Sequence, residues 1–145
     1  MTPAIHIYNN QNQHSVPLKW LRGIAAKAVP LCLAAKKAAP DCVLPDLAEV
    51  EVSYITDEDI TRVHAEFLDD ATPTDVITFH HGEILISADT AVRQAAEHGT
   101  TPEHEMALYL VHGLLHLAGW HDLDDAEAAD MATTQERILA ACEQP

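Results

Sequence analysis

The chain has 145 residues, of which 48% are hydrophobic, and its 8 basic and 23 acidic side chains give a formal net charge of −15. This length suits one globular domain, which we expect to span residues 1–145. The sequence has no apolar run of ~18 residues, which excludes a transmembrane helix. It shows no signal peptide, and its cysteines lack C-x-x-C spacing, so we expect a cytoplasmic protein without a disulfide framework.

The first half of the chain predicts two strands and two helices. Residues 4–8 alternate between apolar and polar side chains, which indicates a strand. Ser15 can cap a helix that runs from about residue 16 into the high thirties, and Pro30 is expected to kink or divide it. A second strand is expected at 50–55, and Thr56 caps the next helix. The buried side of that helix is expected to comprise Ile60, Val63, Phe67 and Leu68.

The second half predicts a hairpin and three helices. After a loop at 69–73, strands are expected at 76–79 and 83–87, and a helix at 89–97. Residues 101–118 open with a Thr-Pro start signal and are apolar on several sides, so this helix should be central. The last helix is expected to start at Asp124 or Asp125 and to bury Ala128, Met131, Ala132, Ile138, Leu139 and Cys142. This order predicts an α+β fold, in which helices cover a small mixed β-sheet of about four strands.

The charge is distributed unevenly along the chain. Residues 1–40 contain no acidic residue and five of the eight basic ones, whereas all 23 acids lie in 41–145. A net charge of −15 argues against a polyanionic partner, because such a field repels phosphates. Two interpretations follow: the basic helix neutralises an acidic body, or it forms a local phosphate-binding face. The candidates for phosphate contacts are Lys19, Arg22 and Lys36.

A cluster of possible metal ligands lies at 112–122, which reads HGLLHLAGWHD. His112 and His116 are four residues apart, so a helix places both imidazoles on one face. Gly119 is a natural helix stop, after which His121 or Asp122 can return toward the same ion. Three protein ligands and an open position are typical of a catalytic zinc, and we expect one zinc per chain on this central helix. Roughly 0.7 such His pairs arise by chance among ten histidines, so two hydrogen-bonded histidines on a buried helix remain the alternative.

The same stretch resembles the signature of the YbeY family of bacterial metal-dependent endoribonucleases, H-G-x-L-H-L-x-G-Y-D-H. Six positions match in place: His112, Gly113, Leu115, His116, Leu117 and Gly119. Trp120 stands where the family has Tyr, and the order of the last two residues is reversed. The resemblance implies that His112, His116 and Asp122 are the metal-binding and catalytic residues, because Asp122 occupies the position of the family's third ligand. A minority of the family is similar in having Asp there, and His121 is the alternative third ligand.

The resemblance extends over roughly residues 50–140. TDVITF at 74–79 looks like the family's T-D-V-L-S-F strand, and 82–87 resembles its G-D-I-x-I strand. The family fold thus implied is a small sheet covered by helices, with the metal helix at its centre. One departure concerns chemistry: Leu68 stands where the family usually has an Arg, a candidate clamp for the phosphate.

A zinc ion held by two imidazoles and a carboxylate lowers the pKa of its water from about 15.7 toward about 7, and the resulting hydroxide can attack a phosphodiester or an acyl carbon. Metalloproteases of the H-E-x-x-H type place a Glu beside the first His. That position is Gly113 here, so a zinc-dependent protease-like hydrolase is the least favoured reading. His80 and His81 are further candidates to line the cleft, although two surface histidines in a hairpin are the simpler interpretation.

The resemblance implies a single-strand-specific endoribonuclease that acts in late 16S rRNA 3′-end maturation and ribosome quality control. Its partners would be ribosomal RNA and the ribosome, with neither DNA nor a membrane. The alternative is a non-catalytic zinc-binding ribosome-assembly factor. Both the net charge of −15 and the missing Arg favour this alternative somewhat, whereas an open coordination position favours the enzyme.

Overall fold

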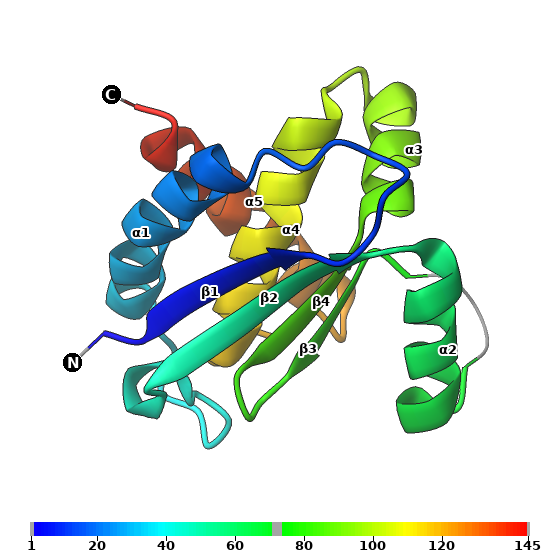
Figure 1. Cartoon of the computed structure of the whole chain (residues 1–145). Helices are drawn as coiled ribbons and strands as arrows, with labels where there is room; N and C mark the ends of the chain where they lie inside the picture. The colour runs from blue at the N-terminus through cyan, green and yellow to red at the C-terminus, as the bar shows by residue number, and fades with distance from the viewer. Residues whose placement is uncertain (1, 71–73, 145) are drawn as a thin grey trace.

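A computed structural model describes residues 2–70 and 74–144 (Figure 1). The strands in this part of the chain are β1 (Ala4–Asn9), β2 (Glu49–Ile55), β3 (Val76–Phe79) and β4 (Glu83–Ser87). The helices are α1 (Leu18–Ala34), α2 (Asp57–Leu68), α3 (Ala88–His98), α4 (Pro102–Leu117) and α5 (Asp125–Cys142), with a short 3₁₀ turn at Leu44–Asp46. None of the described helices is both long and apolar enough to cross a membrane. Of the predicted loop at 69–73, residues 71–73 lie outside the described residues.

The four strands form one mixed sheet, as expected from the sequence, and their order in it is β1-β2-β4-β3. β1 and β4 both run parallel to β2, whereas β3 pairs with β4 in an antiparallel hairpin. Gly82 in the hairpin has a φ of +111°, and a Cβ there would lie 2.8 Å from the backbone oxygen of Glu49, so the tight turn requires glycine. β3 is therefore an edge strand that is paired on one side by β4.

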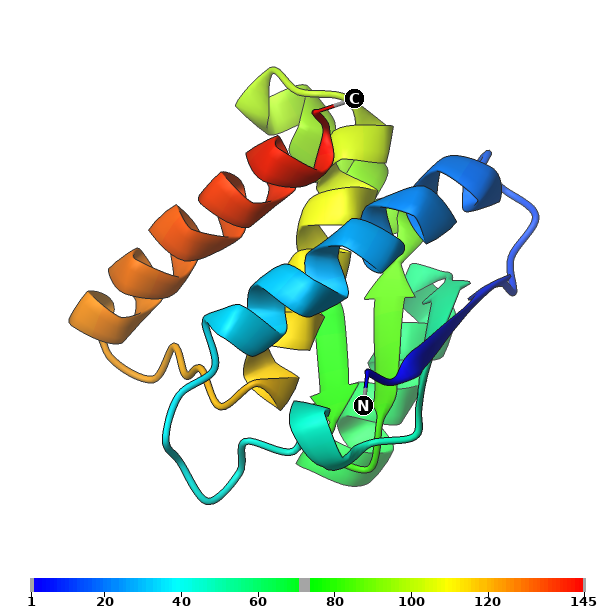
Figure 2. The same cartoon turned by 90° about the vertical axis from the view of Figure 1, so that its left-hand side faces the viewer.

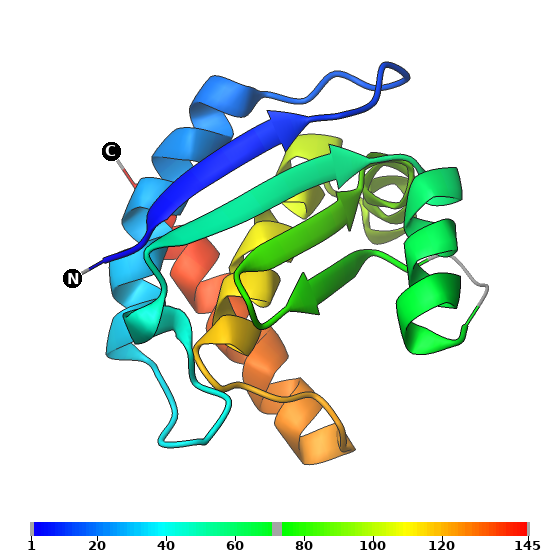
Figure 3. The ribbon, with the colours of Figure 1, turned by 60° about the horizontal axis from the view of Figure 1, so that its bottom comes forward.

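Helices lie on both faces of this sheet. α1, α4 and α5 lie together on one face, and α2 lies on the other face beside β3 and β4 (Figures 1, 2 and 3). The strand period of two explains this division: Ile84 and Ile86 contribute to the large core under α4, whereas Ile77 and Leu85 join Ile60 under α2. α4 is central, as predicted, and it is almost wholly buried, with Met106, Leu110, Leu114, Leu115 and Leu117 fully enclosed.

The sequence signals at α1 were wrong in detail. The helix begins at Leu18, after Pro17, so Ser15 does not cap it, and it ends at Ala34 rather than in the high thirties. Pro30 does not divide the helix, which continues through it. A proline removes one backbone hydrogen bond, to the carbonyl of Ala26; both residues are exposed, so water can satisfy that carbonyl.

On α2 and α5, some of the residues that were predicted to be buried are exposed. On α2, Ile60 is fully buried, but Phe67 and Leu68 are 62% and 53% exposed, although the ring of Phe67 meets that of Phe79 at the end of β3. On α5, the buried residues follow a spacing of three or four, so Thr134 lies inside and Ala132, one residue after Met131, lies outside.

Candidate metal centre

The end of α4 and the turn after it bring three candidate ligands together. Nε2 of His112 lies 3.0 Å from Nε2 of His116, and Oδ2 of Asp122 lies 3.6 and 3.7 Å from these two nitrogens. The sharp turn depends on Gly119, whose φ of +94° favours glycine. Thr101 fixes the other end of α4 by accepting a hydrogen bond from the backbone N–H of His104 at 3.1 Å.

Both imidazoles are oriented through their second ring nitrogen. Nδ1 of His116 lies 3.0 Å from the backbone oxygen of Trp120, and Nδ1 of His112 lies 2.8 Å from Oε1 of Gln135 on α5. A carbonyl oxygen only accepts, so each Nδ1 carries the proton and each Nε2 presents a lone pair. Burial lowers the pKa of His116, and the neighbouring His112 lowers it further, which favours the neutral ring that a metal requires.

This arrangement of donors fits a tetrahedral metal ion. Two Nε2 lone pairs that face each other at 3.0 Å repel unless a metal ion or a proton lies between them. Bonds of about 2.0–2.1 Å in a tetrahedral site place ligand atoms about 3.3–3.4 Å apart, and the three observed separations of 3.0, 3.6 and 3.7 Å bracket that value. The side chain of Asp122 is 40% exposed, against 20% for each histidine, so one side of the centre is open to solvent.

His121 points elsewhere. Its Nε2 lies 3.0 Å from Oδ2 of Asp41, in the segment between α1 and β2. Successive residues of an extended segment point in opposite directions, so a turn that aims Asp122 at the histidines of α4 aims His121 away from them. The structure therefore groups His112, His116 and Asp122, and leaves His121 in a separate ion pair.

Gly113 faces the sheet, and this explains why a protease base is missing. A Cβ at this position would lie 2.8 Å from both Cδ1 and Cγ2 of Ile84 on β4. The helix packs so closely on the strand that a Glu side chain, as in H-E-x-x-H, has no room. The close packing that holds the histidines in place also excludes the general base of a metalloprotease.

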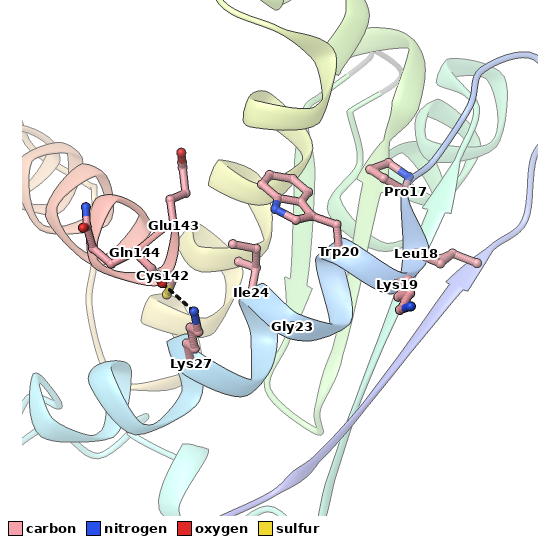
Figure 4. Close-up of a pocket in the computed structure, with 10 residues that line it drawn as sticks. All are labelled: Pro17, Leu18, Lys19, Trp20, Gly23, Ile24, Lys27, Cys142, Glu143 and Gln144. Atoms are coloured by element: carbon pink, nitrogen blue, oxygen red, sulfur yellow. Dashed lines mark hydrogen bonds between the residues drawn. The ribbon is translucent and has the colours of Figure 1, made fainter.

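The predicted basic residues are spread along α1 and beyond its end. Lys36 lies two residues after the end of α1, and its neighbour Lys37 donates its backbone N–H to the oxygen of Ala118 at 2.9 Å. Both lysines therefore lie at the end of α4 that carries His112 and His116, here called its metal end. Lys19 lies at the opposite end of α1, about 25 Å away along a helix of this length. There it lines a cavity of about 730 Å³ between α1 and the end of α5 (Figure 4). Arg22 donates to the backbone oxygen of Ile7, so the structure brings neither residue to the three ligands.

Gln135 orients His112 from another helix, across 23 residues, and no local spacing in the sequence singled it out. Of the two histidines named as further candidates, His80 is close enough to His116 to contribute to lowering its pKa. Nε2 of His81 instead lies 3.3 Å from Oε1 of Glu83, and its ring stacks on Phe79.

Comparisons with known proteins identify the family of the chain and support its fold. The family model "Endoribonuclease YbeY" matches residues 6–143. A Shouchella clausii protein of that name is 36% identical, over 70% of this chain and 77% of its own length, and one from Chloroflexus aurantiacus is 35% identical, over 66% and 74%. The solution structure of TM1509 from Thermotoga maritima shares the fold, with a TM-score of 0.64 at 23% identity over 95% of this chain and 88% of that one.

Proposed function

This chain belongs to the YbeY family, and from that premise we propose that it is a zinc-dependent endoribonuclease acting on single-stranded segments of ribosomal RNA. The observation that carries the proposal is the convergence of His112, His116 and Asp122, with both imidazoles oriented through Nδ1. Two imidazoles and a carboxylate are a common ligand set of catalytic zinc, and we expect one ion per chain.

The three ligands would hold the ion, and the surrounding residues would keep the ligands in place. A bound zinc supplies a Lewis acid and lowers the pKa of a coordinated water toward about 7. Gln135 and the backbone oxygen of Trp120 hold the two rings so that Nε2 faces inward, which removes the cost of orienting them during the reaction. The exposed side of Asp122 leaves room for a phosphodiester to approach.

Phosphate binding must use other groups than the Arg that the family usually carries, because Leu68 stands at that position. Lys36 and Lys37 lie at the metal end of α4, and Nζ of Lys37 lies 4.1 Å above the ring of Trp120. Lys19 and Arg22 extend the basic residues along α1, so we propose that α1 forms a track for the RNA backbone on one side of the cleaved bond.

For its role in the cell, we propose late 16S rRNA 3′-end maturation and ribosome quality control in the cytoplasm, with the ribosome as partner and no DNA. A non-catalytic zinc-binding assembly factor is the second candidate, and the exposed Leu68 in place of Arg favours it. Against it, a structural zinc usually has four protein ligands, whereas three groups converge here among the described residues. The lack of space beside Gly113 argues against a protease.

The test uses purified protein that has been stripped of metal and given a 16S rRNA fragment with an extended 3′ end. We expect cleavage in a single-stranded segment after one equivalent of zinc is added, and none with excess chelator. Protein that binds one zinc per chain and still leaves the RNA intact would contradict the endoribonuclease and support the assembly factor.

A further inference from the structure

Three aromatic rings form a group at the edge of the sheet, here called the aromatic patch: Phe67 of α2, Phe79 at the end of β3, and His81 in the hairpin. Phe67 and His81 are exposed, and Phe79 is half-buried. The rings of Phe67 and Phe79 meet edge to face, with centroids 5.6 Å apart, and His81 stacks on Phe79 at 5.7 Å. These are the only two phenylalanines in the chain, and Phe67 is 62% exposed. A cavity of about 410 Å³ opens against the patch, lined also by Val63, Glu83 and Leu85.

The patch lies on the other side of β3 from the metal centre. Thr78 pairs with Ile84, and Ile84 abuts Gly113 beside His112, so this side of β3 faces α4. Phe79, the next residue, packs with the cluster under α2 on the opposite face. β3 is the edge strand beside α2 (Figure 3), so one chain of RNA can pass around it from one site to the other.

The chemistry of the cavity selects a base rather than a phosphate. None of the described residues that line it is Lys or Arg, and Glu83 would repel an anion. A flat aromatic surface favours a flat ligand, since every nucleobase has a face that stacks, and the Glu83 carboxylate can accept a hydrogen bond from an amino group on that base. The net charge of −15 weakens the attraction between the protein and RNA phosphates, so contacts to bases should provide a larger share of the binding free energy.

We propose that the aromatic patch binds an unpaired nucleobase of the RNA, a few nucleotides from the cleaved bond. The proposal rests on the endoribonuclease function and adds a reason for its preference for single strands, because a base in a duplex is already stacked and paired. Loss of one base–aromatic stack is expected to weaken binding by about 5- to 150-fold.

The first experiment measures single-turnover cleavage of a short single-stranded RNA by zinc-loaded full-length protein over a range of protein concentrations. Phe67→Ala should raise the half-saturating concentration by about 5- to 150-fold and leave the maximal rate within a few-fold, whereas Phe67→Tyr should keep the wild-type value. Leu68→Ala is the matched control, because this neighbouring side chain is also exposed and apolar but has no ring. Equal effects of Phe67→Ala and Leu68→Ala would overturn the proposal while leaving the endoribonuclease intact.

A second experiment measures stacking in the absence of cleavage. RNA with one fluorescent 2-aminopurine base is titrated with metal-free full-length protein in excess chelator, where no cleavage is expected, with the base placed in turn at each position. Wild type and Phe67→Tyr should quench the fluorescence at one or two positions, and Phe67→Ala should not. Quenching that is the same for all three proteins would refute the patch as a base site. A wild-type dimer that Phe67→Ala dissociates in sedimentation would also refute it, since a second copy would then cover the patch.

Discussion

Asp122→Ala should abolish tight zinc binding, whereas His121→Ala should leave it nearly unchanged. Oδ2 of Asp122 lies 3.6 and 3.7 Å from the two Nε2 atoms, so its loss leaves a site with two ligands. Loss of a group that only orients a ligand already costs 10–100-fold in metal affinity, so loss of the third ligand should exceed about 100-fold, or about 2.7 kcal/mol. His121 instead pairs with Asp41, and both side chains are more than a third exposed, so this pair contributes little to the stability of the turn. Its loss should therefore change the zinc affinity by less than about 5-fold.

Competition against a chromophoric chelator measures both affinities, and circular dichroism verifies that each variant is folded. The two positions are adjacent, so a general effect of disturbing the turn would appear in both variants. The reasoning is refuted if His121→Ala empties the site while Asp122→Ala retains zinc. The site would then comprise three histidines and would require a different turn after Gly119.

Three further predictions concern stability and RNA binding. Gly113→Ala should lower the free energy of unfolding by about 1–3 kcal/mol in chemical denaturation, because its Cβ would lie 2.8 Å from atoms of the facing strand; an unchanged midpoint would refute this close packing. Partial burial raises the pKa of Asp57, but bonds from a serine, an arginine and a threonine outweigh it and hold that pKa below its usual value. The ionised Asp57 carboxylate therefore stabilises the fold above about pH 4, and this contribution is lost as the pH falls through the lowered pKa. Asp57→Asn should have a free energy of unfolding about 1–3 kcal/mol below that of wild type at pH 7, and this difference should disappear in acid. Changing Lys19, Arg22 and Lys36 together to Glu should weaken RNA binding and flatten its salt dependence; an unchanged slope would mean that α1 only compensates charge.

Local signals in the sequence predicted most of the fold. The strands at 76–79 and 83–87 have the predicted bounds, and Thr56 and Thr101 cap α2 and α4 as expected. These features depend on residues within a few positions of one another, which periodicity and capping rules describe. Of the two outcomes expected at Pro30, a kink or a division, the division does not occur, because solvent can reach the carbonyl that the proline leaves unpaired.

The candidate site could be predicted only in part, for the same reason. Residues four apart lie on one face of any α-helix, so the sequence alone was enough to predict that His112 and His116 lie side by side. The partner of His121 is Asp41, about 80 positions earlier, and the proton on His112 depends on Gln135. Phe67 of α2 meets Phe79 of β3 and is still 62% exposed. Such pairings are set by tertiary packing, which no local pattern encodes.

The measurement that tests the central claim most directly is the rate of RNA cleavage as zinc is titrated into metal-free protein. We expect the rate to rise linearly and to stop rising at one equivalent of zinc per chain. His112→Ala and Asp122→Ala should show no such rise at the same concentrations. A rate that is independent of zinc, or that is equal in His112→Ala and wild type, would contradict a metal-dependent nuclease centred on these residues.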